Sequence, residues 1–146
     1  MPMRLLVVDD HQLFRAGLVA MLRHRLGEDA TIVEAESYAE ALAILTEATT
    51  FDAVLCDIDM PDLGPERHIG RVVAQAGAIP VIIVTASTFP SVDASARALG
   101  ARGYINKDEG AAKVLEGIRH VLAGEIYLGE ETSQKILSRL AGQSLS

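Results

Sequence analysis

The chain has 146 residues, a length typical of one domain, and its composition, 49% hydrophobic and 23% charged, is that of a globular protein. A formal net charge of −7 without a basic stripe argues against nucleic-acid binding by this segment, and no apolar run reaches the roughly 20 residues of a membrane span. The single cysteine, Cys56, excludes an intramolecular disulfide, and no basic-then-apolar leader opens the chain, so we expect a cytoplasmic protein.

The first half of the chain predicts three strands and two helices. Apolar runs predict strands at residues 5–8, 31–33 and 51–56. Between the first two strands, apolar residues from Leu13 to Leu22 recur at helical spacing. Ser37 and Glu40 have the spacing of a capping box, which predicts a second helix that ends near Ala48.

The second half continues the alternation of helices and strands. Strands are expected at residues 81–84 and 103–105, and Pro65 and Pro90 can each occupy the first turn of a helix. Asp108 can cap the next helix, and a last helix is expected over residues 132–141. The inner face of the helix after Asp108 is predicted to contain Val114, Leu115, Ile118, Val121 and Leu122.

Uninterrupted apolar strands indicate burial on both faces, and strict alternation of strands and helices indicates a parallel sheet with right-handed crossovers. We therefore predict an α/β fold: a flavodoxin-like, doubly wound, five-stranded parallel sheet of the (βα)5 type with strand order 2-1-3-4-5 and an additional C-terminal helix. Residues 1–124 are expected to form the domain and residues 125–146 an extension or linker helix. In this architecture, ligands bind outside the carboxyl ends of the strands.

Polar side chains are concentrated at those strand ends. Asp9 and Asp10 follow the first strand, Asp57 the third, Thr85 ends the fourth, and Lys107 follows the fifth. Three carboxylates close together repel one another by roughly 1–4 kcal/mol per pair at about 4 Å. A magnesium ion, which prefers oxygen ligands and often combines carboxylates with a phosphate, relieves this repulsion. The pattern therefore favours phosphoryl transfer to a carboxylate.

Four motifs carry a family resemblance. They are LLVVDDH at residues 5–11, VLCDIDMP at 54–61, IVTAS at 83–87 and GARGYINKD at 100–108. In this order they resemble the receiver domains of two-component response regulators over about residues 3–124. Residues 123–128 are similar to the NarL/LuxR subfamily, whose receivers precede a helix-turn-helix DNA-binding domain.

The resemblance implies a role for each strand-end residue. Asp57 would be the phosphoacceptor, Thr85 would bond the phosphoryl group and Lys107 would pair with it. Tyr104 would be a switch aromatic that moves inward with Thr85. The Mg²⁺ ligands would be Asp10 and Asp57 directly, Asp9 nearby or through water, and the backbone carbonyl of Asp59.

The resemblance also implies partners. A histidine kinase would donate the phosphoryl group, and DNA would be bound through a C-terminal domain absent from this chain. A homodimer could form through the fourth helix, fifth strand and fifth helix, or through the first and fifth helices. The chain would support only its own phosphorylation and dephosphorylation, so it is not expected to be an enzyme.

Two other functions stay open. The Asp57-Ile58-Asp59 segment resembles the nucleophile motif of haloacid-dehalogenase-type phosphatases, but in those enzymes the nucleophile comes before the paired acids, not after them. A pseudo-receiver, an interaction module that takes no phosphate, is the other alternative, because the loop after Pro61 is short and its glycine is displaced. The four histidines, His11 among them, show no metal-ligand spacing, so no histidine metal site is expected.

Overall fold

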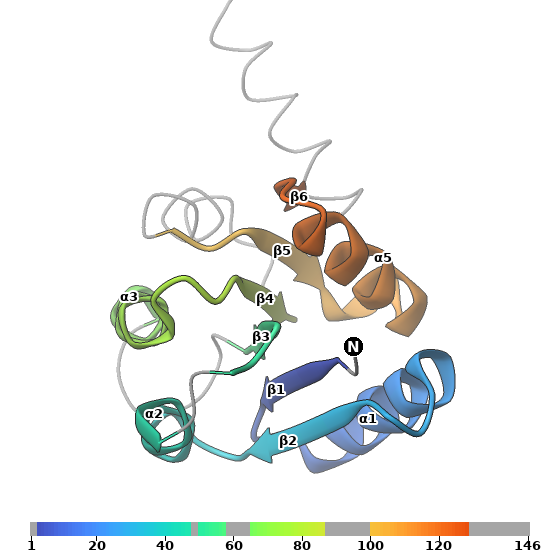
Figure 1. Cartoon of the computed structure of the whole chain (residues 1–146), viewed down its shortest axis with the longest axis horizontal. Coiled ribbons are helices and arrows are strands. Elements are labelled where there is room, and N and C mark those ends of the chain that lie inside the picture. Colours follow the sequence, from blue (N-terminus) through green and yellow to red (C-terminus); the bar gives the residue numbers. More distant parts are fainter. Residues whose placement is uncertain (1–2, 48–49, 58–64, 87–99, 129–146) are drawn as a thin grey trace, which may run out of the picture.

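The computed structural model describes residues 3–47, 50–57, 65–86 and 100–128 of the chain. These residues form a parallel sheet between two layers of helices (Figure 1). The expected helix at Pro90 and the expected C-terminal helix at 132–141 lie outside the described residues.

The described part of the sheet has six strands in the order β2-β1-β3-β4-β5-β6, and every pairing is parallel. The order of the first five strands confirms the prediction. The strands are β1 (Arg4–Val8), β2 (Thr31–Ala35), β3 (Ala53–Cys56), β4 (Val81–Thr85), β5 (Gly103–Asn106) and β6 (Tyr127–Leu128). The sixth strand corrects the expectation of five: it pairs with β5, with Tyr127 opposite Gly103.

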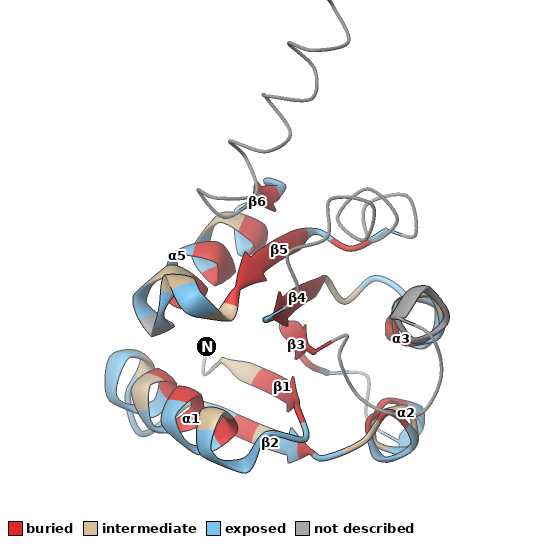
Figure 2. Cartoon of the chain, turned by 180° about the vertical axis from the view of Figure 1, so that it is seen from behind, coloured by how far each residue is buried: buried red, intermediate tan, exposed pale blue. Residues whose placement is uncertain are grey.

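Of the helices in the described residues, two lie on each face of the sheet (Figure 1). On one face lie α1 (Gln12–Leu26) and α5 (Ala111–Leu122), and on the other lie α2 (Tyr38–Glu47) and α3 (Pro65–Ala76). The central strands β1, β3, β4 and β5 are buried along almost their whole length (Figure 2). This burial on both faces explains why their sequences are continuously apolar instead of alternating.

The helix starts are set by local chemistry. Ser37 Oγ accepts a hydrogen bond from the Glu40 backbone N–H at 3.1 Å, as the capping-box spacing predicts, and α3 begins at Pro65. Asp108 does not cap α5, contrary to the prediction. It lies in the 3-10 helix η1 (Lys107–Glu109), where its N–H donates to Asn106 Oδ1 at 2.8 Å, and Gly110, with φ of 89°, precedes α5 instead.

The expected inner face of α5 needs one correction, and in α1 one residue of the apolar periodicity does not face the sheet. In α5, Val114, Leu115, Ile118 and Val121 are buried as predicted, but Leu122 is 39% exposed. Leu122 is the last residue of the helix, so no further turn covers it. Successive residues of an α-helix are about 100° apart around its axis, so Leu13 lies about 140° around α1 from the buried Leu18. Leu13 therefore faces solvent and is 89% exposed.

Gly117 sets how closely α5 approaches the sheet. A Cβ atom at this position would lie 2.6 Å from Ile105 Cδ1 on β5 and 3.1 Å from the Tyr127 ring on β6. The missing side chain therefore lets α5 pack directly on the strand that leads to Lys107. The packing of this helix and the position of the strand end are coupled.

Candidate functional site

The structure brings the predicted polar residues to one edge of the sheet. Val8 pairs with Cys56, so Asp9 and Asp57 leave adjacent parallel strands at the same level. Thr85 pairs with Asn106, which places Lys107 one residue beyond the end of β5. Parallel pairing thus converts four separate sequence motifs into one cluster, as expected for a doubly wound sheet.

The carboxylates of the cluster differ in burial. Asp9 and Asp57 are 3% and 1% exposed, whereas Asp10 is exposed. One ligand atom from each of Asp9, Asp10, His11 and Asp57 lies within 4.8 Å of the others. Buried carboxylates at such separations require compensating positive charge. Three carboxylate oxygens also fit the ligand preference of Mg²⁺.

Lys107 supplies one compensating charge. Its Nζ lies 2.8 Å from Asp9 Oδ2 and 2.8 Å from Asp57 Oδ2, and its side chain is only 10% exposed. Burial lowers the pKa of Lys107, but the hydrogen bonds to Asp57 and Asp9 outweigh it and leave the pKa above its ordinary value. The ammonium therefore stays charged at the centre of the cluster.

His11 belongs to the cluster, although its spacing in the sequence gave no indication of a metal site. Its Nδ1 lies 2.9 Å from Asp9 Oδ1 and 3.0 Å from Lys107 Nζ. The hydrogen bond to Asp9 raises the pKa of His11, and the nearby Lys107 charge opposes this. The spacing of the histidines does not indicate this location, but the position of His11 directly after two strand-end aspartates does.

Arg15 and Tyr38 form hydrogen bonds to the backbone that carries the cluster. The sequence alone did not indicate this role for either residue. The Arg15 guanidinium donates to the backbone carbonyl of Asp9 and bridges Glu34 at 3.0 Å and Glu36 at 3.2 Å. The Tyr38 hydroxyl donates to the backbone carbonyl of Asp57. These contacts fix the backbone on which Asp9 and Asp57 are carried.

Cys56 is a buried neighbour of the site. It is fully buried, and burial raises the pKa of its thiol, with the Asp57 charge acting in the same direction. The thiol therefore stays protonated, and Cys56 packs as a small hydrophobic residue in the core that α2 and α3 cover.

The two predicted switch residues are both buried. Thr85 is 0% exposed at the end of β4, and Tyr104 is 2% exposed on β5 within the core that α2 and α3 cover. Tyr104 pairs with Ile83, which lies on β4 two residues before Thr85. Asp59, whose backbone carbonyl was predicted as a metal ligand, lies outside the described residues.

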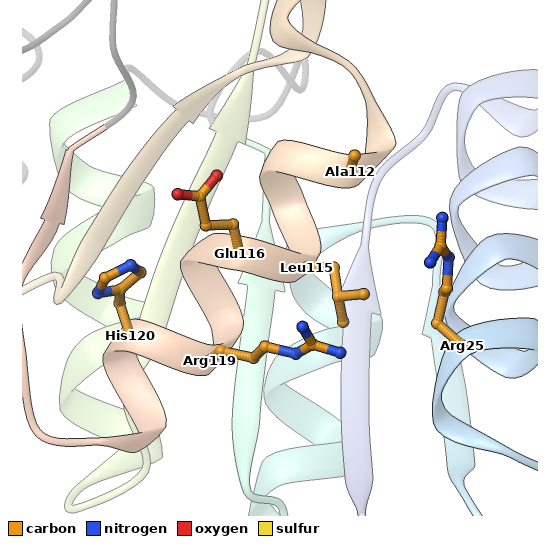
Figure 3. Close-up of a pocket in the computed structure, with 6 residues that line it drawn as sticks. All are labelled: Arg25, Ala112, Leu115, Glu116, Arg119 and His120. Atoms are coloured by element: carbon orange, nitrogen blue, oxygen red, sulfur yellow. The ribbon is translucent and has the colours of Figure 1, made fainter.

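A pocket of about 280 Å³ lies away from this cluster, between α1 and α5 (Figure 3). It is lined by Arg25, Ala112, Leu115, Glu116, Arg119 and His120. None of these residues was predicted to belong to a functional site. The carboxylate cluster and this pocket therefore share no residues.

Comparison with protein families gives a match to the response regulator receiver domain over residues 5–119. The chain is 32% identical to the response regulator GacA of Pseudomonas viridiflava over 91% of this chain and 61% of that protein. It is 29% identical to the response regulator UvrY of Escherichia coli O6:H1 over 90% of this chain and 59% of that protein. The chain thus spans about 60% of the length of these curated relatives.

Solved structures give the same assignment. A two-component response regulator of the LuxR family from Aurantimonas sp. SI85-9A1 has a TM-score of 0.87 and 28% identity, and the match covers 97% of this chain and 99% of that one. A CheY-like receiver domain protein from Methanospirillum hungatei has a TM-score of 0.75 and 24% identity, over 85% of this chain and 96% of that one, which supports the fold. Among the described helices, none has the length and apolar character to cross a bilayer.

Proposed function

Since the chain belongs to the response-regulator receiver family, a family of signalling modules, we propose that Asp57 accepts a phosphoryl group in a Mg²⁺-dependent reaction. The observation that carries this proposal is the environment of the Asp57 carboxylate. Its Oδ2 lies 2.8 Å from Lys107 Nζ, and the carboxylates of Asp9 and Asp10 share the same cluster. Positioning and charge neutralisation are what phosphoryl transfer to a carboxylate requires.

Each residue of the cluster has a role in this reaction. An Asp57 oxygen attacks phosphorus, the new O–P bond forms as the N–P bond of a phosphohistidine donor breaks, and the released imidazole nitrogen takes a proton. Lys107 balances the charge on the phosphoryl oxygens. Asp10 and Asp57 would hold the metal directly, Asp9 would lie close by or act through water, and the backbone carbonyl of Asp59, which is outside the described residues, would complete the set. The metal would supply positive charge that offsets the carboxylates and the incoming phosphoryl group.

The conformational response involves Thr85 and Tyr104. In this proposal the Thr85 hydroxyl bonds the phosphoryl group, and the shift of Thr85 favours the inward position of Tyr104, the position that its burial corresponds to in this structure. The burial of both side chains supports a coupled change, because a displacement in a close-packed core is transmitted to its neighbours. The surface of β5 and α5 would then change, and a partner could detect the change.

The proposal also concerns the whole protein to which this chain would belong. We infer a cytoplasmic transcription regulator in which a histidine kinase is the phosphodonor and residues 1–124 form the receiver, with residues 125–146 as an extension. DNA binding would belong to a C-terminal domain outside this chain, and the part of the GacA relative that this chain does not match leaves room for such a domain. A homodimer, formed through α5 and its neighbours or through α1 and α5, is a further part of the proposal.

The direct experiment is incubation with acetyl phosphate and Mg²⁺, followed by mass mapping of the modified residue. We expect one phosphoryl group on Asp57, none in Asp57→Asn, and full modification of the control Asp29→Asn, which changes an exposed aspartate after α1. Modification at another residue in the Asp57→Asn variant would refute the assignment.

The same preparation tests the alternatives. Sustained hydrolysis of generic phosphomonoesters would favour a phosphatase over a receiver. No modification of a folded, Mg²⁺-binding protein would favour a pseudo-receiver. Single-site modification without turnover is the outcome that the receiver proposal requires.

A further inference from the structure

The ammonium of Lys107 has an aromatic neighbour as well as charged ones. Its Nζ lies over the ring of Phe14, 4.6 Å from the ring centroid. Asp9 Oδ2 and Asp57 Oδ2 are each 2.8 Å from the same nitrogen, and His11 Nδ1 is 3.0 Å away. A cation within about 6 Å of an aromatic centroid, over the ring face, is attracted by the ring quadrupole. Phe14 therefore attracts the ammonium without offering a ligand atom to a metal ion.

The ring of Phe14 is held by the core. Phe14 lies in the first turn of α1, and its partly buried side chain packs against the hydrophobic cluster that contains Leu18. Leu18 is four residues further along α1 and therefore on the same side of the helix. Phenylalanine has two side-chain torsions, whereas lysine has a flexible four-carbon stem. The ring is thus a fixed surface for the more flexible Lys107 side chain.

The aromatic and the charged contacts of Lys107 would respond differently to phosphorylation. In the proposed reaction Asp57 takes the phosphoryl group and Asp9 lies beside the metal, so both carboxylates would acquire other partners. The Phe14 ring is neutral and binds neither phosphate nor Mg²⁺. Its attraction for the ammonium would therefore persist throughout the transfer, while the contacts of Lys107 with the carboxylates change.

We propose that Phe14 is a positioning residue, whose ring face holds the Lys107 ammonium where it can pair with the phosphoryl group during transfer to Asp57. The inference rests on the proposed function, because it concerns the same transfer. Phe14 acts on the reaction through Lys107. The phosphorylation rate should therefore depend on the electron density of the ring face, and not only on the volume of the side chain.

The test replaces Phe14 in the full chain with phenylalanines that carry increasing numbers of fluorine atoms, up to pentafluorophenylalanine. Fluorine withdraws electron density from the ring face and changes the volume of the ring little, so packing is kept. The readout is the rate at which acetyl phosphate and Mg²⁺ modify Asp57. Each added fluorine should slow the reaction, and pentafluorophenylalanine at this position should slow it roughly 10-fold. Phe14→Leu, which removes the ring face, should give a similar fall.

Phe51 offers a matched control. Its ring lies 5.2 Å from the guanidinium carbon of Arg4, the first residue of β1, so it forms a second cation–π pair at the opposite ends of the strands. The same fluorinated residues at position 51 should leave the phosphorylation rate unchanged. Circular dichroism of every variant, including Phe14→Leu, shows whether the fold is kept.

A double-mutant cycle tests whether Phe14 acts through Lys107. In a Lys107→Ala background, fluorination of Phe14 should leave the already slow rate unchanged, because the cation is gone. A flat series in the wild-type background, or an equal fall in both backgrounds, would overturn the inference even if Asp57 is phosphorylated. If Asp57 of wild type takes no phosphoryl group, the proposed function fails and the inference fails with it.

Discussion

The cluster at the strand ends and the pocket between α1 and α5 are two charged regions of one chain, and their charges are held differently. In the cluster, Lys107 contacts two nearly buried carboxylates at 2.8 Å. In the pocket, Arg25 and Arg119 extend from two helices on either side of Leu115 (Figure 3), and neither forms an ion pair with any residue that the structure describes.

The remaining charges of the pocket are paired locally along α5. Glu116 pairs with Lys113 at 3.3 Å, and His120 pairs with Glu125 at 2.5 Å. Such exposed pairs contribute little, because water and salt screen them. In this molecule the pocket and the reactive side chains are therefore in different places. The pocket is lined by solvated charged side chains around the buried Leu115, whereas the reactive groups converge where parallel strands end and burial strengthens their interactions.

The largest effect on stability and phosphorylation is expected from Lys107→Ala. Loss of the ammonium leaves buried carboxylates uncompensated, so the free energy of unfolding should fall by about 3 kcal/mol without a divalent ion. Saturating Mg²⁺ should restore part of this loss by binding the native cluster. Phosphorylation by acetyl phosphate should slow by roughly 100-fold even with Mg²⁺, since about 2.7 kcal/mol of transition-state stabilisation is a typical loss for one charge-stabilising donor.

Denaturant titrations with and without Mg²⁺ measure the stability effects of Lys107→Ala, and mass spectrometry measures the rate. Lys113→Ala is the control, because Lys113 makes an exposed pair on α5. Equal stability of Lys107→Ala and wild type without metal would show that the cluster is not strained by its charges.

Arg15→Leu should have a smaller effect and shows how far the cluster depends on its support. The substitution removes the donor to the Asp9 carbonyl and the bridge to Glu34 and Glu36, which are partly exposed and can be solvated. We expect a loss of about 1–3 kcal/mol from the unsatisfied carbonyl. Mg²⁺ affinity should fall as the Asp9 backbone loosens, and calorimetry can measure it. A stability loss with unchanged Mg²⁺ affinity would limit Arg15 to a structural role.

The order of the central strands and the convergence of Asp9, Asp57 and Lys107 could be predicted from the sequence, because both follow from apolar runs and from where those runs end. His11 and Arg15 could not. Periodicity treats an arginine on a helix as solvated, and only the tertiary contact with the Asp9 carbonyl shows that Arg15 is buried. The start of α5 was mispredicted for a similar reason: Asp108 lies in η1, which Asn106 caps, and Gly110 precedes α5.

The smallest effect is expected from the pocket. Arg25→Ala combined with Arg119→Ala removes two positive charges that make no ion pair within the described residues, so the free energy of unfolding should change by less than about 0.5 kcal/mol. Phosphorylation of Asp57 should stay within about two-fold of wild type, because within the described residues neither arginine makes an ion pair with the cluster, and salt screens exposed charges. Denaturant titration and the acetyl phosphate assay measure both quantities. A large fall in the phosphorylation rate would mean that the two regions are coupled through α1 or α5, and the separation between hollow and chemistry would then be wrong.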